Sequence, residues 1–506
     1  MQRILAEQFS KLTAADKLML ARGLADLVSV TEGKLVCATG CSGTDLIIDA
    51  LVDTFALLGE TFGHSVQVLH EFSCENIGFK QEFIRAHFDP PAVFPDLAKL
   101  ASATAVDAKD RDKHVTSPFF WACGIECDSI SALNKARGSN FDCIGADHES
   151  RTGSTSRSCM KFIQFHKPPL FLLECVKNLQ VTGKSGRSNL AILRAMANEV
   201  GYLLMDFALN SLRYGVPQRR DRSYMVGIRY QESGFSQDAE DFVLPSWVAD
   251  VVRTLDALQI DMLPLADFLL LDNDPKVLMA TQPQREDVDP KKLDGHKTAN
   301  RKAKVEVETV DGSNVEAYKM ENLAAYFCAG LQWPPVFTDA FLEKTQMRSH
   351  RQKQVLWLIE HTQGAADMLP DLTVRDLHMS HDWQADRVGC LPCIASSSAL
   401  WVRGPRRPGT SSPDTIDRFL CGSELLAVQG LEHRRQNVSG FSESQLRELA
   451  GNAFNAAVIY PLLFAVIAFA PVAAASRFER GSGRTVVVNM DDDDDSGEFV
   501  SDVGRW

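Results

Sequence analysis

From Lys34 to about residue 230, short apolar runs alternate with longer stretches of helical spacing, and this alternation leaves few folds open to the chain. The apolar runs are typical of buried strands, because each is short and rich in β-branched or aromatic residues. They are KLVCAT, VQVLHEF, FFWACGI, PLFLLEC and SYMVGI, and the helical stretches between them include DLIIDALVDTFALLG and NIGFKQEFIRAHF. Strands that alternate with helices usually pair in parallel, since each helix forms the crossover. The sequence therefore predicts an α/β fold with a doubly wound, mostly parallel sheet.

The second half of the chain has a different pattern. After about residue 230 the sequence becomes charged and mixed, as in QREDVDPKKLDGHKTANRKAKVEVE, which predicts a second domain. Apolar helices return at SELLAVQGL and LRELAGNAFNAAVIYPLLFAVIAF, and the acidic end MDDDDDSGEFVSDVGRW is expected to be disordered. The expected divisions are an N-terminal helical extension at 1–33, a main α/β domain at 34–230, a second domain at 231–412, a return to the main domain at 413–475 and a tail at 476–506.

The overall charge limits how the protein meets nucleic acid. The 506-residue chain carries a formal net charge of -13, so as a whole it repels a polyanion. Any such contact must therefore come from local basic stretches. Three candidates are RKAK at 301–304, MRSHRQK at 347–353 and RGPRR at 403–407. They are candidate phosphate contacts, and solvated surfaces are the alternative interpretation.

The start of the chain bears on where the protein works. Its first twenty residues contain charges that exclude the apolar core of a secretory signal. These charges are Arg3, Glu7, Lys11, Asp16 and Lys17. We therefore expect an intracellular protein whose twelve cysteines are reduced and form no disulfide framework.

One apolar stretch raises the question of a membrane. Residues 456–475 are uncharged and about long enough to span a bilayer. Pro461 and Pro471 interrupt this run, however, and a helix buried against a sheet explains it better. No membrane contact is therefore expected.

Small and acidic residues follow three of the expected strands. Gly40 and Gly43 lie in a turn after the first strand, where small residues let the backbone approach a bound cofactor. Glu75 follows the second strand, where a carboxylate can accept hydrogen bonds from ribose hydroxyls. Asp96, in VFPDLAKL, is a further acid that can lie beside adenine. An ordinary tight turn, a solvated carboxylate and a helix N-cap are the respective alternatives.

A thiol, a carboxylate and two guanidinium groups are expected at the same edge of the sheet. Cys127 follows the strand FFWACGI and Glu174 lies in the next strand. Gln218, Arg220 and Arg222 precede a further strand. Aimed at one crevice, these groups can attack and polarise a pyrimidine. An inert core cysteine and an ion-paired strand edge are the alternatives.

Taken in order, these segments and their neighbours resemble the sequence blocks of cytosine-5 DNA methyltransferases. The blocks are GCSG, CENIGFKQEFIRAHF, FPDL, GIECDSIS, SRSCMKF, FLLECVKNL, YGVPQRRDR, SELLAVQGL and AGNAFNAAVI, and they cover residues 34–230 and 413–470. The resemblance implies the Rossmann-like fold of a class I methyltransferase. It also implies that residues 231–412 are a target-recognition domain inserted before the C-terminal helices.

The same resemblance implies S-adenosyl-L-methionine as the cofactor. Within its site, Glu75 matches the ribose carboxylate and Asp96 the adenine contact. The cofactor-binding residues that the resemblance implies are Ala38, Gly40, Cys41, Gly43, Glu75, Asn76, Asp96, Leu97, Glu126, Met160, Asn452 and Ala453.

The resemblance further implies methyl transfer to C5 of cytosine in double-stranded DNA. Cys127 matches the nucleophile that adds to C6 of a base flipped out of the duplex. Glu174 matches the acid that engages N3, and Arg220 with Arg222 match the pair that holds the base and the catalytic loop. A nuclear location is expected if the source is eukaryotic, and no obligate protein partner is implied.

The residues around the nucleophile depart from the family. Its Pro-Cys-Gln is Glu126-Cys127-Asp128 here. Two carboxylates beside the thiol are expected to raise its pKa and disfavour the thiolate. Arg220 and Arg222 are candidates to neutralise these carboxylates when the loop closes.

Two further positions depart from the family. Its Glu-Asn-Val is Glu174-Cys175-Val176 here, so an amide that orients the nucleophile loop is expected to be missing. Asn76 stands where an aromatic residue often stacks on adenine. These departures favour one alternative, a catalytically silent relative that binds DNA or a partner enzyme. Another alternative is a tRNA cytosine-5 methyltransferase, with RNA as the partner, although that branch is compact and lacks a long inserted segment.

A possible metal site lies within the second domain. His378, His381, Cys390 and Cys393 form an HxxH followed by a CxxC, a ligand set that zinc accepts. The segment GCLPCIASSSALWV also resembles the strand that ends the family's recognition domain. No metal is therefore assigned.

Overall fold

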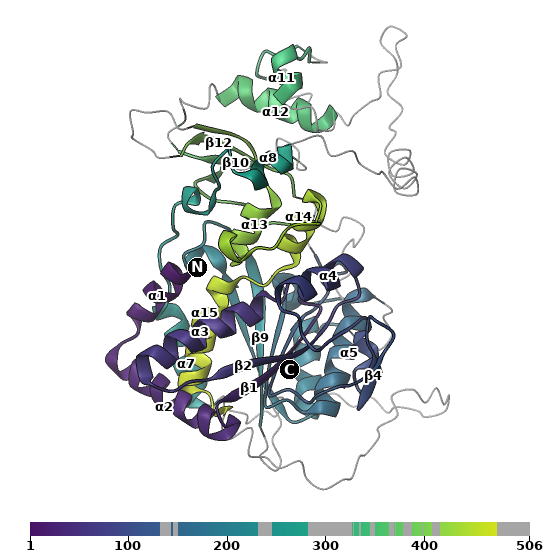
Figure 1. The fold of residues 1–506 in the computed structure, drawn as a ribbon, viewed down its shortest axis with the longest axis vertical. Helices are drawn as coiled ribbons and strands as arrows, with labels where there is room; N and C mark the ends of the chain where they lie inside the picture. The colour runs from purple at the N-terminus through teal and green to yellow at the C-terminus, as the bar shows by residue number, and fades with distance from the viewer. Residues whose placement is uncertain are drawn as a thin grey trace.

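The computed structural model describes residues 1–131, 143–144, 150–230, 245–281, 326, 328–332, 335–344, 350–363, 369, 371–377, 387–396, 398–406 and 415–472. Its main feature is a seven-stranded sheet of order β3-β2-β1-β6-β7-β9-β8 (Figure 1). The strands are β1 Lys34–Gly40, β2 Gln67–Cys74, β3 Ala92–Phe94, β6 Phe120–Gly124, β7 Leu170–Val176, β8 Tyr202–Asn210 and β9 Asp221–Arg229. Neighbouring strands are parallel, except that β9 is antiparallel to both β7 and β8. The predicted mostly parallel sheet is confirmed.

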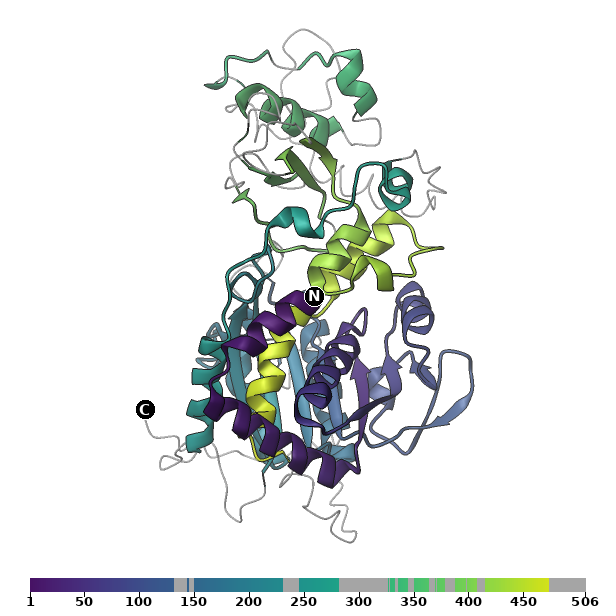
Figure 2. The same cartoon turned by 60° about the vertical axis from the view of Figure 1, so that its left-hand side comes forward.

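Helices cover both faces of this sheet (Figure 2). One face packs against α1 Gln2–Lys11, α2 Ala14–Thr31, α3 Leu46–Phe62, α4 Gly78–His87, α7 Ser246–Ala257 and α15 Ala456–Phe469, and the other against α5 Arg151–His166 and α6 Asn189–Glu199. Each face has its own apolar core, with Leu51 and Leu463 in the first and Phe162 and Leu193 in the second. The central strands are buried on both sides, which is why their sequences are continuously apolar. The sheet is thus doubly wound, as predicted.

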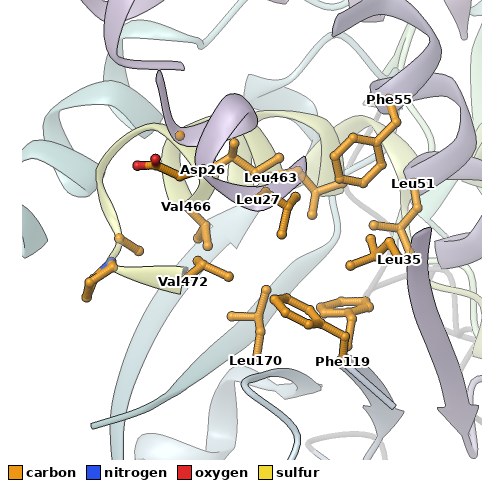
Figure 3. A pocket seen from close by; sticks show the side chains of 15 residues that line it. Asp26, Leu27, Leu35, Leu51, Phe55, Phe119, Leu170, Leu463, Val466 and Val472 are labelled. Carbon is orange, nitrogen blue, oxygen red and sulfur yellow. The ribbon is translucent and has the colours of Figure 1, made fainter. Parts of the chain in front are cut away.

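An apolar cavity of about 270 Å³ lies where the parallel strands begin (Figure 3). Leu35, Phe119 and Leu170 line it from the starts of β1, β6 and β7, and α2, α3 and α15 close it from the side. Open α/β sheets bind their ligands at the opposite edge, where the strands end. The cavity is therefore not part of the candidate site described below.

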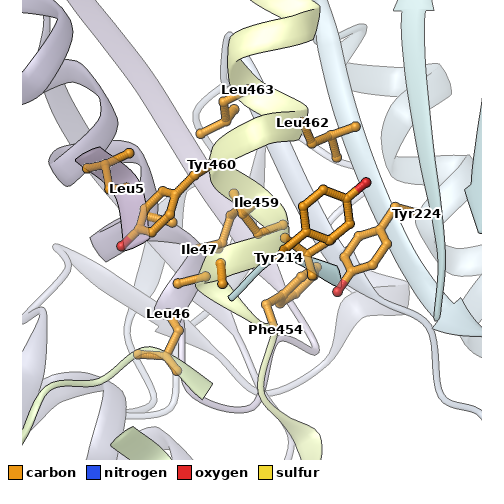
Figure 4. Close-up of a cluster of buried hydrophobic side chains, with 14 of the residues drawn as sticks. Leu5, Leu46, Ile47, Tyr214, Tyr224, Phe454, Ile459, Tyr460, Leu462 and Leu463 are labelled. Atoms are coloured by element: carbon orange, nitrogen blue, oxygen red, sulfur yellow. The ribbon is translucent and has the colours of Figure 1, made fainter. Parts of the chain in front are cut away.

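Helix α15 runs through the first core beside Tyr214 and Tyr224 (Figure 4). Its residues from Ala456 to Ala468 are all buried. By length and composition, Glu443–Phe469 is the one segment among the described residues that could cross a membrane, and 89% of its apolar stretch is buried inside the protein. The expected helix buried against the sheet is confirmed.

Pro461 lies inside α15, whereas the sequence suggested that it interrupts the run. A proline lacks the N–H that would bond to the carbonyl four residues earlier, which here belongs to Ala457. Gln8 of α1 replaces that donor, because its Nε2 donates to the Ala457 carbonyl at 2.8 Å and to the Tyr214 carbonyl at 3.1 Å. Gln8 is fully buried. A side chain from another helix thus allows α15 to continue past its proline.

A smaller unit stands above the main sheet in Figure 1. Its antiparallel sheet has the order β11-β10-β12-β13. The strands of this sheet are β10 Thr373–Asp376, β11 Arg387–Val388, β12 Leu400–Pro405 and β13 Thr415–Phe419. The remaining helices are α8 Pro275–Thr281, α11 Asp339–Lys344, α12 His350–Gln363, α13 Gly422–Gln429 and α14 Glu443–Asn452. A separate pair of short strands is formed by β4 Thr104–Val106 and β5 Asp112–His114. A separate core around Phe341, Leu356 and Trp401 joins α11 and α12 to this sheet. Helices α13 and α14 lie between the two sheets (Figure 1).

Candidate active site

The expected cofactor residues gather at the edge where the parallel strands end. The Cys41 N–H donates to the carbonyl of Cys74 at 2.7 Å, so the turn after β1 lies against the end of β2. The Glu75 N–H donates to the carbonyl of Phe94 at 2.9 Å, which ties the end of β2 to β3. The turn, Glu75 and the segment after β3 therefore lie side by side.

Gly40 and Gly43 are glycines for steric reasons. A Cβ on Gly40 would lie 2.6 Å from the Trp121 ring. Gly43 has a positive φ of 71°, and a Cβ there would lie 3.1 Å from the Cβ of Asn452. The chain after α14 thus returns onto the turn after β1, and Asn452 lies next to Gly43 as the sequence blocks predict.

The two acids at this edge differ in environment. Glu75 is only 5% exposed, its Oε1 accepts the Ile77 N–H at 3.1 Å, and burial raises the pKa of its carboxyl. Asp96 is exposed, and its Oδ1 accepts the Ala98 N–H at 2.9 Å as the N-cap of a short 3₁₀ turn. The N-cap alternative for Asp96 is therefore what the structure contains, and a ligand contact by its other oxygen stays a prediction.

The remaining expected cofactor residues divide into surface and core. Asn76 is exposed beside Glu75. Ala38, Leu97 and Met160 are buried members of the second core. The sequence blocks predicted all four residues at the cofactor, whereas the burial of Ala38, Leu97 and Met160 shows that these three pack mainly against the protein.

Arg220 and Arg222 converge on Glu174. Arg222 Nε lies 3.1 Å from Glu174 Oε1, and Arg220 Nη2 lies 3.4 Å from the same oxygen. Arg220 also donates to the carbonyls of Gly451 and Ala453, at 3.1 Å and 2.8 Å. Its side chain is only 3% exposed. The three expected catalytic side chains thus form one buried cluster that also holds the connection between α14 and α15.

Cys127 follows β6 and lies within electrostatic reach of this cluster. Burial raises the pKa of its thiol, Arg222 opposes that rise, and Glu174 and Asp128 add to it. The predicted direction of the pKa change is therefore correct, but burial is a larger cause than the flanking carboxylates. Burial and the two acids outweigh Arg222, so the arrangement disfavours the Cys127 thiolate.

Arg151, the first residue of α5, contacts both flanking carboxylates. Its Nη1 lies 3.4 Å from Glu126 Oε1 and 3.6 Å from Asp128 Oδ2. The sequence pointed to Arg220 and Arg222 for this role, and in the structure those residues contact Glu174 instead. Arg151 was missed because it lies outside the sequence blocks, 25 positions after Glu126 in the chain.

Replacing Arg151 by alanine is expected to move the alkylation of Cys127 to higher pH. Without the guanidinium, Glu126 and Asp128 oppose the thiolate more strongly. The change should be modest, since Arg151 is 76% exposed and solvent screens the pair. Iodoacetamide labelling across a pH series, followed by mass spectrometry of the Cys127 peptide, measures it. Lys161→Ala on the same helix is the control, and an unchanged profile in the Arg151 variant would contradict the assignment.

The loop after Cys127 is anchored despite the missing asparagine at position 175. Ile130 and Ser131 donate their N–H groups to the Cys127 carbonyl, at 3.0 Å and 2.8 Å. Asn178 Nδ2 donates to the Ile130 carbonyl at 2.9 Å. Cys175 is buried, and Asn178 of the same sequence block supplies the amide. The signal was present in FLLECVKNL, three residues beyond the substituted position.

The basic stretches are only partly described, and one prediction about them is wrong. RKAK lies outside the described residues, as does the start of MRSHRQK. In RGPRR, Arg403 and Arg406 are buried. Arg403 Nε lies 3.2 Å from Asp417 Oδ1, and Arg406 Nη2 donates to the Leu270 carbonyl at 2.9 Å. These two arginines hold the small unit together and are not phosphate contacts.

Only two of the four candidate zinc ligands, Cys390 and Cys393, lie in the described part of the chain. His378 and His381 lie outside the described residues. Cys393 accepts a hydrogen bond from Arg222 Nη2 at 3.5 Å. Within the described part of the chain, no three histidine, cysteine or acidic side chains are grouped to hold a metal ion. The set therefore remains without an assignment.

The sheet order, its one antiparallel strand and the residues at its edge define a class I methyltransferase. Residues 144–467 match the family model of the C-5 cytosine-specific DNA methylases, and the chain belongs to this family. Its cofactor is S-adenosylmethionine. The matched range includes Glu174, Arg220 and Arg222 and begins after Cys127.

Curated relatives agree with this family. The chain is 25% identical over 472 residues to a DNA (cytosine-5-)-methyltransferase DMT5 of Cryptococcus neoformans, covering 88% of this chain and 17% of the relative. A DMT5 of Verticillium dahliae is 21% identical over 514 residues, covering 92% and 21%. The type II methyltransferase M.SsoII of Shigella sonnei is 27% identical over 212 residues, covering 41% and 49%. The chain thus spans about a fifth or less of the length of the two fungal relatives.

Proposed function

We propose that this protein transfers a methyl group from S-adenosylmethionine to C5 of cytosine in double-stranded DNA, with Cys127 as the nucleophile. The observation that carries the proposal is the buried contact of Arg220 and Arg222 with Glu174, within electrostatic reach of Cys127. This cluster lies at the same edge of the sheet as the turn at Gly40–Gly43, where α/β sheets bind ligands.

In the proposed mechanism the target cytosine leaves the duplex before the chemistry begins. The Cys127 thiolate adds to C6, and the electron pair of the C5–C6 bond becomes available at C5. Glu174, held by both arginines, engages N3 as an acid, and the proton that it donates there offsets the negative charge that the ring gains from the thiolate. The bound cofactor supplies the methyl group to C5. Loss of the C5 proton and departure of the Cys127 thiolate then restore the double bond.

The residues at the cofactor edge suit S-adenosylmethionine. The glycine turn lets the backbone approach the cofactor closely, and the carboxylate of Glu75 at the end of β2 can accept hydrogen bonds from the ribose hydroxyls. Glu75→Ala is expected to weaken cofactor binding at least about tenfold, since a hydrogen bond to a charged group contributes roughly 1.5–3 kcal/mol. Calorimetric titration with S-adenosylmethionine measures the affinity, and the exposed Glu82→Ala on α4 is the control. Equal affinity in the Glu75 variant would remove the ribose assignment.

The nature of the substrate is tested directly by trapping. A duplex that carries 5-fluorocytosine blocks loss of the C5 substituent, so an active nucleophile stays attached to the base. We expect a covalent adduct with the DNA duplex in the presence of cofactor, and none with a matched tRNA stem. An RNA adduct alone would favour the tRNA enzyme.

A silent DNA-binding relative is the second candidate function. The substitutions Glu126 and Asp128 beside the thiol favour it. DNA retention without any adduct, together with an adduct in Glu126→Pro, would establish it in place of the enzyme.

In this proposal, residues 231–412 recognise the target and the main sheet carries the catalytic residues. Within that segment, β10, β11 and β12 belong to the small antiparallel sheet, which β13 completes, and α11 and α12 pack on it, whereas α7 packs on the main sheet. In a eukaryotic cell this function places the protein in the nucleus.

A further inference from the structure

A loop of the small unit is hydrogen-bonded to the segment that leads into β9 and contains Arg220. Leu391 donates its N–H to the Pro217 carbonyl at 2.7 Å, and Arg219 donates its N–H to the Leu391 carbonyl at 2.9 Å. These two bonds form a parallel bridge between Gln218 and Leu391. The loop is thus held in register immediately before β9.

This register brings Cys393 to the guanidinium of Arg222. Arg222 Nη2 donates to Cys393 Sγ at 3.5 Å, and Nη1 donates to the Asp221 carbonyl at 2.8 Å. Arg222 Nε lies 3.1 Å from Glu174. All three nitrogens of the guanidinium are therefore engaged, and only the Cys393 contact comes from outside the main sheet.

We propose that Cys393 is a positioning residue, whose sulfur holds the Arg222 guanidinium in the orientation that contacts Glu174. The proposal deepens the proposed function and rests on it for its kinetic consequence. Through this contact, docking of the target-recognition unit on the main sheet sets the geometry of the catalytic cluster.

The charged groups around Cys393 also connect it electrostatically to Cys127, the proposed nucleophile. Arg222 and Arg220 face it from the segment of β9, and Glu174 faces it from β7. Burial opposes ionisation of Cys393, but the two arginines outweigh it and lower the pKa of this thiol. Arg222 also favours the thiolate of Cys127. Cys393 and Cys127 therefore share one guanidinium, and a neutral side chain at position 393 leaves more of its field for Cys127.

The test compares Cys393→Ala and Cys393→Ser in the 506-residue protein. Methyl transfer to DNA should fall about tenfold in kcat for alanine, with little change in KM for the cofactor, because one hydrogen bond to a charged group is lost. Serine should restore most of the rate, since its oxygen accepts the same bond. In both variants, iodoacetamide labelling of Cys127 should move to lower pH. Cys390→Ser is the matched control and should change neither quantity.

The two readouts separate this proposal from the proposed function. Wild-type kcat in Cys393→Ala, with an unchanged pH profile of Cys127, would overturn the positioning role. If the wild-type protein transfers no methyl group, the labelling profile alone decides, and an unchanged profile again overturns it. If alanine prevents folding, as judged by circular dichroism, the serine variant decides through the pH profile.

Discussion

Replacing Cys127 by alanine is expected to reduce methyl transfer at least about a thousandfold, because alanine removes the attacking atom and little else. Cofactor binding should persist, since the turn at Gly40–Gly43 and Glu75 lie on other strand ends. The measurement is transfer of a labelled methyl group to duplex DNA, with trapping on 5-fluorocytosine as a second readout. Neither product should form.

A matched control is available for this experiment. Cys328→Ala removes an exposed thiol that is distant in sequence from Cys127, and it should leave both readouts unchanged. A Cys127→Ala protein that keeps more than about a tenth of the wild-type rate would place the nucleophile elsewhere. The wild-type rate should also rise with pH, because burial raises the pKa of the Cys127 thiol and only the thiolate attacks.

Replacing Arg220 by alanine is expected to damage stability and catalysis together. The change leaves the carbonyls of Gly451 and Ala453 without their buried donor, which costs roughly 1–3 kcal/mol for each carbonyl, whereas Glu174 keeps its contact with Arg222. Asn452, which lies between these carbonyls in sequence, packs on Gly43. Cofactor affinity should therefore fall along with methyl transfer. Urea unfolding and calorimetry measure the two effects.

The neighbouring arginine provides the control for this prediction. Arg219 is 62% exposed, and its Nε lies 3.9 Å from Asp221 Oδ2. Arg219→Ala should change stability by less than about 0.5 kcal/mol. Arg220→Lys should not rescue function, since one ammonium cannot replace the planar fork that reaches Glu174 and both carbonyls. Full activity in the lysine variant would show that only the charge matters.

The sheet could be predicted because its strands are short, apolar and bounded by turns. The sequence did not mark β3, Ala92–Phe94, which has only three residues. It also did not mark β8, Tyr202–Asn210. Asp206 interrupts its apolar pattern, and the structure accommodates that carboxylate with hydrogen bonds from Gln180 and Ser223. These partners are distant in the sequence, so periodicity alone could not identify them.

The candidate site was predictable only as far as its sequence blocks extend. Glu174, Arg220 and Arg222 meet as expected, and they do so because β9 is antiparallel to β7, which brings the start of β9 to the edge where β7 ends. The pairing of Arg151 with Glu126 joins two residues that are 25 positions apart in the chain. The burial of Arg403 depends on a strand register. Neither a distant pairing nor a register can be predicted from charge clusters.

The proline in α15 also constrains how this sequence can diverge. Gln8 serves both the Ala457 carbonyl, which Pro461 leaves without a donor, and the Tyr214 carbonyl, and only the second needs it once position 461 regains an N–H. The two positions therefore form an epistatic pair: loss of the glutamine costs less stability after loss of the proline. Among homologous sequences, this dependence should appear as co-variation between the first helix and the last.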